Sequence, residues 1–320
     1  MKDEIKKFWK GDIEDSDEVL TKYSRDASLL EVRPELVVFP KNSEDIKNLV
    51  KWVNENKSKY PNLALTPRSA GTCMAGGAIG ESIIMDFTRY MNKIEKVERV
   101  SPFQITPKYP DAHPVSITGK AIVAPGVYYR DFEPQTLAQG LLLPCYTASK
   151  SLNALGGMVG NNSAGEKTLN YGKTEDYISS LKVVFADARE YIVKPLNKKE
   201  LYAKIAQNDF EGDIYKKIYQ LINENKEDVR KAKPNVSKNS AGYYLWNVWD
   251  EEKEIFDLCK LIVGSQGTLG IVTEITFHLV DVKASSKLVV IFMKDIEHLG
   301  EIVDVILPHH PESLESYDDA

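Results

Sequence analysis

A glycine-rich loop between two short apolar runs is the part of the sequence best suited to bind an anion. It lies within Leu63–Gly80, and its glycines are Gly71, Gly76, Gly77 and Gly80. Residues without a Cβ let backbone N–H groups approach a negatively charged ligand closely. Arg68 and the hydroxyls of Ser69 and Thr72 could donate further hydrogen bonds to it. An ordinary glycine-rich turn has the same composition, so this loop alone does not decide between the two.

Two more loops of small residues follow, at 156–172 and 264–270. The glycines and asparagines between residues 145 and 172 exclude a long regular helix there. Irregular backbone between strong structural segments needs partners for its polar groups. Three such loops in one chain favour a long ligand such as a dinucleotide, which the backbone would hold at several points.

The common nucleotide-binding motifs do not fit these loops. Gly71 has no glycine two residues before or after it, which excludes a GxGxxG fingerprint after a first strand. The run 160–168 approaches a phosphate-binding G-x4-G-K-S/T loop, but Glu166 precedes Lys167 and moves the lysine out of register. A P-loop nucleotidase is therefore not expected.

The sequence has no pattern for a metal centre or a hydrolase nucleophile. Its histidines lack metal-ligand spacing beyond the adjacent pair His309 and His310, and its three cysteines are widely separated. A GxSxG elbow is also absent. We therefore expect no metal site, and the catalytic residues are unknown at this point.

Charge and composition narrow the partners and the compartment. The net charge of −6 argues against nucleic acid as the main partner. The N-terminus has no apolar signal segment, and no apolar run reaches the length of a membrane span. Three unpaired thiols suit a reducing compartment. These features predict a cytoplasmic protein whose association with membranes is at most peripheral.

The first loop is expected inside a compact β-α-β unit. Leu36–Pro40 is typical of a strand, and Ser43 is expected to cap a helix that runs to about Lys57. Strands at 63–66 and 82–87 then flank the glycines.

Further elements are expected along the rest of the chain. The proline-rich residues 101–119 indicate a surface excursion, and 181–185 with 191–193 indicate a hairpin. Short apolar runs predict strands at 261–263, 271–279 and 286–293.

Taken together, the three loops resemble those of a known family. Pro67–Thr72 with Gly76 and Gly77 resembles the pyrophosphate loop of FAD-linked oxidases of the p-cresol methylhydroxylase and vanillyl-alcohol oxidase type. Gly156–Gly165 with Tyr171-Gly172 is similar to that family's second flavin loop, and Gly264–Thr273 to its third. Ser240–Tyr243 resembles a segment of the D-lactate, D-2-hydroxyglutarate and glycolate dehydrogenase branch.

The resemblance implies an α+β fold in which two subdomains hold FAD between them, followed by a substrate or cap domain. It places the first subdomain at 1–97, the second at 98–280 and the start of a truncated cap domain at 281–320. The residues that it assigns to the cofactor are Arg68, Ser69, Ala70, Gly71, Thr72, Gly76, Pro144, Ser149, Gly156, Gly157, Asn162, Ser163, Gly165, Tyr171, Gly172, Gln266, Gly267, Gly270 and Ile271.

Several positions depart from the family pattern. Ser69 and Ala70 stand where glycines are usual, Ala164 replaces another glycine, and Gln266 stands where the family usually has Glu. Some relatives attach FAD covalently through a His in the first loop or a Cys near the second. This chain has Thr72 in the first loop and Lys150 near the second position. We therefore expect non-covalent FAD.

The implied activity is oxidation of a small D-2-hydroxy acid such as lactate, glycolate or 2-hydroxyglutarate, with hydride transfer to flavin N5 and proton removal by a base. That base is expected beyond Ala320, so this chain is expected to bind FAD but to turn over hydroxy acids poorly. The electron acceptor stays open among a quinone, an electron-transfer flavoprotein, an iron–sulfur protein and oxygen.

Other classes also fit the sequence. An alkyl-transfer flavoenzyme of ether-lipid synthesis would share the FAD domain without net redox change. A flavin-binding, electron-carrying or scaffold subunit would need no catalytic residues. The plainest alternative is an α+β domain with glycine-rich turns and no cofactor.

Overall fold

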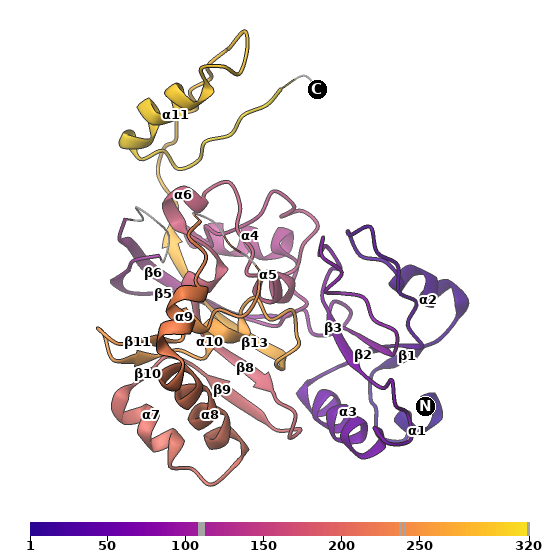
Figure 1. Cartoon of the computed structure of the whole chain (residues 1–320). Coiled ribbons are helices and arrows are strands. Elements are labelled where there is room, and N and C mark those ends of the chain that lie inside the picture. The colour runs from indigo at the N-terminus through magenta and orange to yellow at the C-terminus, as the bar shows by residue number, and fades with distance from the viewer. Residues whose placement is uncertain (108–112, 237–238, 240, 319–320) are drawn as a thin grey trace.

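The computed structural model describes residues 1–107, 113–236, 239 and 241–318, and confirms the expected α+β class (Figure 1). The α-helices are α1 Lys2–Ile5, α2 Asp17–Tyr23, α3 Ser43–Asn56, α4 Tyr129–Leu137, α5 Leu155–Asn161, α6 Thr168–Tyr171, α7 Lys198–Ile205, α8 Phe210–Glu224, α9 Lys226–Ala232, α10 Cys259–Ile262 and α11 Leu299–Ile306. Short 3-10 helices lie at Thr174–Tyr177, Leu245–Asn247 and Leu307–His309. The strands are β1 Asp12–Glu14, β2 Leu36–Phe39, β3 Leu65–Arg68, β4 Ile83–Asp86, β5 Ile94–Ile105, β6 Val115–Val123, β7 Leu141–Leu142, β8 Ile178–Val184, β9 Glu190–Val193, β10 Leu196–Asn197, β11 Trp249–Asp250, β12 Ile255–Phe256 and β13 Ile271–Asp281.

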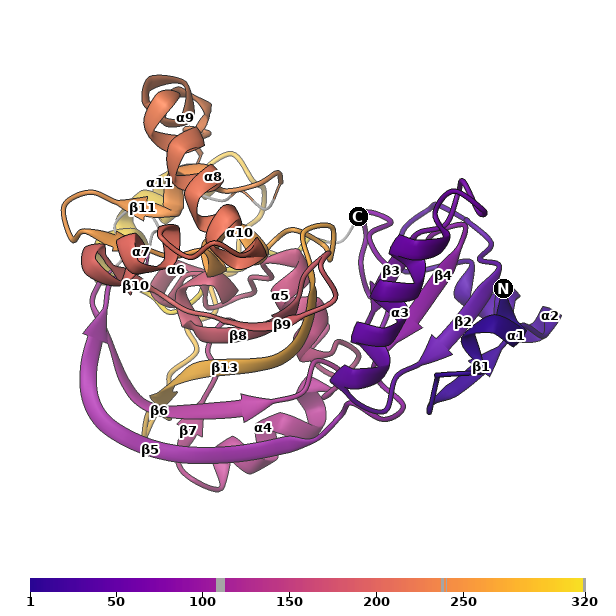
Figure 2. The same cartoon turned by 90° about the horizontal axis from the view of Figure 1, so that it is seen from below.

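The first sheet carries the first glycine-rich loop. Its order is β1-β2-β4-β3; the strands β2, β4 and β3 are parallel and β1 is antiparallel. Parallel neighbours need a crossover, and α3 supplies it between β2 and β3 (Figure 2). The predicted strand–helix–strand unit is confirmed. Its helix is capped by Asn42 rather than Ser43, because Asn42 Oδ1 accepts from Glu44 N at 3.0 Å and Asp45 N at 3.2 Å.

The second sheet is antiparallel and positions the other two loops. Its strand order is β5-β6-β13-β8-β9, and β7 also pairs with β13. The predicted hairpin is confirmed as β8 and β9, with Val183 opposite Tyr191. Val184 and Ile271 of this sheet are buried in the same apolar cluster as Ile46 and Leu49 of α3. The two sheets are therefore joined by a shared patch of core.

The region 101–119 was wrongly predicted as a surface excursion. Much of it forms β5 and β6, which pair with each other. β5 is an edge strand with mostly exposed residues, and its register shifts between Arg99 and Phe103, around Pro102. Edge strands and bulges tolerate proline because an outward N–H is not needed for pairing. The proline-rich composition of this region therefore led to a wrong prediction for β5.

Two other strand predictions were also wrong. Residues 261–263 belong largely to α10 and the residue after it, because a short buried apolar run looks alike in a strand and a helix. Residues 286–293 have no regular structure, with Leu288 88% and Phe292 93% exposed. The C-terminal segment with α11 stands away from the sheets (Figure 1).

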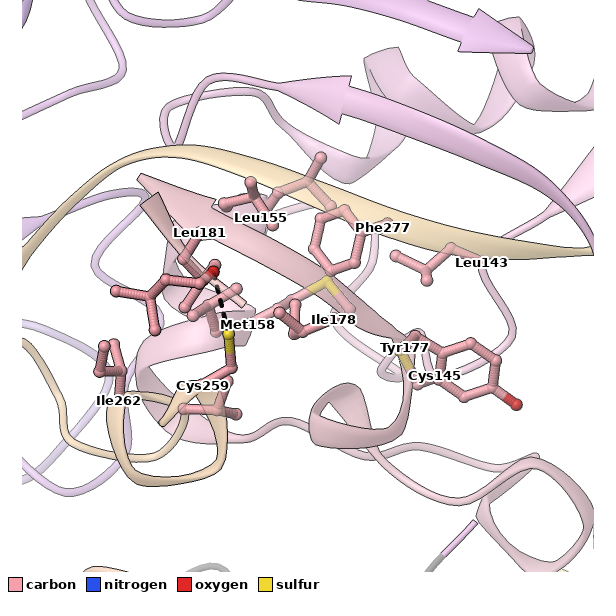
Figure 3. Packing of buried hydrophobic residues seen from close by; sticks show 14 of the residues in the cluster. Leu143, Cys145, Leu155, Met158, Tyr177, Ile178, Leu181, Cys259, Ile262 and Phe277 are labelled. Atoms are coloured by element: carbon pink, nitrogen blue, oxygen red, sulfur yellow. Dashed lines mark hydrogen bonds between the residues drawn. The ribbon is translucent and has the colours of Figure 1, made fainter. Parts of the chain in front are cut away.

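The main apolar core fixes the second loop on the second sheet. Leu155 and Met158 of α5 pack with Ile262 of α10 and Phe277 of β13, all nearly inaccessible to solvent (Figure 3). Full burial of each such side chain contributes about 1.5–3 kcal/mol. The Cys259 thiol also donates to the Val193 carbonyl at 3.3 Å (Figure 3). This packing holds α5 rigid where it meets the loops.

A half-buried histidine gives the fold a predicted acid sensitivity. Burial and the nearby charge of Lys260 lower the pKa of His278 from 6.5 to about 4. Its stabilising contribution is complete above pH 6.5 and is lost as the pH falls toward 4, because the unfolded chain then binds the extra proton. The slope is at most about 1.4 kcal/mol per pH unit. The free energy of unfolding, measured with urea between pH 7 and 4, should therefore fall more steeply with decreasing pH in the wild type than in His278→Gln. Equal slopes would contradict this.

Candidate functional site

The three glycine-rich loops meet around one cavity of about 540 Å³. The loop 67–78 follows β3, the segment 147–164 includes α5, and the residues 262–272 connect α10 with β13. The predicted cofactor residues that line the cavity are Arg68, Ser69, Ala70, Gly71, Thr72, Ser149, Gly156, Gly157, Ser163, Gln266, Gly267 and Gly270. Its size is in the range of cofactor pockets.

Other predicted residues lie beside the cavity rather than in its wall. These are Gly76, Pro144, Asn162, Gly165, Tyr171, Gly172 and Ile271. Asn162 turns its Oδ1 to the backbone N–H of Glu175, at 3.0 Å. Tyr171 donates its hydroxyl to Glu312 at 3.2 Å. A Cβ on Gly165 would lie 1.8 Å from the Tyr146 carbonyl oxygen, so this glycine serves close backbone packing.

The remaining members of that group also have local packing roles. Gly76 has φ +78°, and a Cβ there would meet Leu30. Gly172 has φ +75°, and a Cβ there would meet the Asp176 side chain. Pro144 and Ile271 are buried. Backbone conformation accounts for the two glycines, and Ile271 packs in the same apolar cluster as α3.

The Arg68 side chain stabilises the first loop through hydrogen bonds to backbone carbonyls. Its Nη1 donates to the carbonyls of Arg25, at 2.9 Å, and Ala78, at 3.1 Å. The guanidinium also lies 5.0 Å from the centre of the Tyr23 ring. Burial lowers the pKa of Arg68, and the charge of Asp86 opposes that shift. The arginine stays cationic, so it ties the loop together and leaves a positive charge at the cavity wall.

Backbone N–H groups in the same loop are free to bind an anion. Within the part of the chain that the structure describes, the N–H groups of residues 69–72 donate no hydrogen bond, and neither does that of Gly157. Gly71 makes the turn possible with φ +70°, and a Cβ there would lie 2.3 Å from Arg68 Nη2. Successive free amides around a left-handed residue form an anion-binding concavity. The Ser69 hydroxyl donates to the Pro125 carbonyl at 3.1 Å and so ties the loop to the segment that follows β6 of the second sheet.

The third loop locks the other two together. Gln266 has φ +52° and donates its backbone N–H to the Gly160 carbonyl at 2.9 Å. Its side-chain Oε1 would lie 2.2 Å from a Cβ on Gly77. A Cβ on Gly267 would lie 2.2 Å from Pro67 Cγ. These glycines allow the three loops to approach one another across the cavity.

The charge of the wall suits an anionic ligand. Among the described lining residues, Arg68 is the one charged side chain, and none is a carboxylate or a histidine. In the same described part of the chain, no group of three or more potential metal ligands occurs. The wall can therefore hold a phosphate-bearing molecule but offers it no general base other than the Cys73 thiol.

Some lining residues were missed by sequence reasoning. They include Cys73, Met74, Phe87, Pro125, Thr147, Asn153, Gly160, Asn161 and Ser265. Most are direct neighbours of the motif residues, so sequence proximity could have indicated them. Phe87 and Pro125 follow the distant strands β4 and β6, and nothing in their local sequence signals the cavity. Ser240 lies outside the described residues, while the Tyr243 hydroxyl is 2.7 Å from Thr268 Oγ1 in the third loop.

Free amides, a glycine-lined wall and one arginine are what a dinucleotide pyrophosphate requires. The family described as an FAD binding domain matches residues 34–193, half of the 320 residues. This chain belongs to that family of FAD-binding proteins.

Relatives and a solved structure agree with this assignment. D-2-hydroxyglutarate dehydrogenase of Escherichia coli is 27% identical over 78% of this chain and 23% of its own length. Glycolate oxidase subunit GlcD of Bacillus subtilis is 26% identical over 92% of this chain and 48% of its own length. The chain thus spans between about a quarter and a half of these relatives.

The solved structure of an alkyldihydroxyacetonephosphate synthase is similar to this one over 88% of this chain and 40% of the synthase chain, with a TM-score of 0.56 and 19% sequence identity. That likeness confirms the predicted fold of the FAD-linked oxidases. None of the described helices is both long and apolar enough to cross a membrane.

Proposed function

We propose that this protein is an FAD-dependent oxidoreductase that oxidises a small D-2-hydroxy acid. The observation that supports FAD as the cofactor is the cavity wall, with free amides at 69–72 and, among the described lining residues, Arg68 as the one charged side chain. The substrate class is supported by the names of the two relatives, since 2-hydroxyglutarate and glycolate are both 2-hydroxy acids. Bound FAD would supply a hydride acceptor.

In this proposal each loop has its own part of the cofactor to hold. The amides of 69–72 bind the pyrophosphate, and Arg68 maintains the shape of their loop. Gly157 lets the cofactor approach α5, and Gly156 lets α5 pack against Pro125 and Ser69 beside it. Gly267 with Gly270 closes the third side. Residues 1–97 and 98–280 act as two subdomains around the site, and 281–320 begin a substrate domain.

FAD is expected to bind without a covalent bond. The first loop carries Thr72 and no histidine, and Lys150 near the second loop pairs with Glu133 at 2.8 Å. Denaturation of the purified yellow protein in acid, followed by ultrafiltration, should release all flavin into the filtrate. Flavin absorbance retained with the precipitated protein would contradict this, and boiled free FAD mixed with albumin provides the control.

The substrate class is tested by anaerobic reduction of the bound flavin. Because no described lining residue is a carboxylate or a histidine that could take the hydroxyl proton, D-lactate, D-2-hydroxyglutarate and glycolate should bleach the visible flavin absorbance only slowly. The L-enantiomers of the chiral acids should do so more slowly still. Dithionite serves as the control that the flavin can be reduced. A flavin that dithionite bleaches and no 2-hydroxy acid does would overturn the proposed substrate. Once a 2-hydroxy acid has reduced the flavin, its reoxidation by a quinone, an electron-transfer flavoprotein, an iron–sulfur protein or oxygen would identify the electron acceptor.

A further inference from the structure

One buried side-chain oxygen in the cavity wall has no hydrogen-bond partner among the described residues. Asn153 lies in the segment before α5, is 4% exposed and lines the cavity. Its Nδ2 donates to Thr147 Oγ1 at 2.7 Å. Its Oδ1 is buried and accepts no hydrogen bond from any described residue. An unsatisfied buried acceptor is costly, and its presence in a native fold calls for an explanation.

The backbone around Asn153 holds the residue firmly in this place. Its N–H donates to the Ser149 carbonyl at 3.0 Å, and its own carbonyl accepts from Tyr129 N at 3.1 Å. The Thr147 and Ser149 hydroxyls lie 2.8 Å apart and also line the cavity. The three side chains therefore form one linked row, Thr147–Ser149–Asn153, on the wall.

The chemistry of this row favours a hydrogen-bond donor of a flavin nucleotide over its phosphates. All three side chains are neutral. The neighbouring cation Lys150 is engaged by Glu133 at 2.8 Å. A phosphate oxygen only accepts hydrogen bonds, so it cannot satisfy Asn153 Oδ1. A hydroxyl can donate to Oδ1, and adjacent hydroxyls can exchange hydrogen bonds with Ser149 and Thr147.

We propose that the row Thr147–Ser149–Asn153 binds the sugar or sugar-alcohol hydroxyls of FAD, with Asn153 Oδ1 accepting from one of them. The inference rests on the flavin site and assigns a cofactor-positioning role to a residue that the loop motifs do not include. The torsion of an Asn amide has a broad minimum, so the oxygen can adjust to the ligand.

The test compares Asn153→Leu and Asn153→Asp with the wild type by calorimetric titration with FAD, FMN and ADP. Asn153→Leu should weaken FAD binding about 10-fold, the size expected for one hydrogen bond. Asn153→Asp keeps an acceptor and should bind FAD better than Asn153→Leu. A loss shared with FMN places the hydroxyl on the ribityl chain, and a loss shared with ADP places it on the ribose.

Asn170→Leu is the matched control, because Asn170 lies in the same region of the chain but not in the cavity wall. The apo form of Asn153→Leu should melt close to the wild type and lose only part of the FAD-induced rise in melting temperature. Unchanged FAD affinity in Asn153→Leu would overturn the inference. So would weaker binding by Asn153→Asp than by Asn153→Leu, since a phosphate would then face the site. A wild type that binds no FAD would instead contradict the flavin site itself.

Discussion

Replacing Gly157 with valine is expected to abolish FAD binding while the protein stays folded. A Cβ on Gly157 would lie 3.8 Å from the Ser69 Cβ, which is ordinary van der Waals contact. The protein itself therefore tolerates a side chain there. The two γ-carbons of valine, however, would enter the cavity that Gly157 and the first loop both line. That space is where the free N–H groups of Gly157 and residues 69–72 must reach the cofactor.

The loss should exceed about 100-fold in Kd, since it combines steric exclusion with several broken hydrogen bonds. Titration of the apoprotein with FAD, followed by quenching of flavin fluorescence, measures it. Gly300→Val is the matched control, because Gly300 is also helical and a Cβ built on it would have no atom within 4 Å. Wild-type affinity in Gly157→Val would show that the cofactor does not lie against Gly157 in this cavity.

Glycines that the sequence presents alike have different roles in the structure. A Cβ on Gly157 would make only an ordinary contact at the cavity wall, whereas Gly165 sits against the Tyr146 carbonyl, where any side chain would displace backbone. Both belong to the same Gly-rich stretch, and the resemblance assigned both to the flavin. Composition reveals that backbone is approached closely, but only the fold reveals whether a ligand or another segment approaches it.

The elements that position the site could be predicted where they rest on local pattern. The β2–α3–β3 unit follows from an apolar run and one helical face, and both were present in the sequence. β5 could not be predicted, because an exposed edge strand with Pro102 has no apolar alternation. The role of Arg68 was also out of reach, since the Arg25 carbonyl lies on another segment of the chain and the Ala78 carbonyl at the far end of the loop.

A buried ion pair supports the end of the second loop. Lys173 Nζ lies 2.9 Å from Glu175 Oε1, and their side chains are 7% and 1% exposed. Asn247 Nδ2 donates to the second carboxylate oxygen at 3.1 Å. Burial opposes the charged form of Glu175, but the positive charges of Lys260 and Lys173 outweigh it and lower the pKa of the carboxyl. The same residue donates its backbone N–H to Asn162, which ends α5.

Replacing Glu175 with glutamine should therefore destabilise the protein by about 3–5 kcal/mol, because it leaves a buried lysine without its counter-charge. Urea unfolding measures this change. The double variant Lys173→Met with Glu175→Gln removes the uncompensated charge and should recover much of the lost stability, since a neutral pair of similar size avoids the cost of burying an ion. If the double variant is as unstable as the two single changes added together, the two side chains do not interact and the assigned role of the pair is wrong. FAD titration of Glu175→Gln and of the double variant extends the test to the site. An affinity that falls in the single variant and returns in the double variant would show that the ion pair acts on the site through the position of Asn162 and α5.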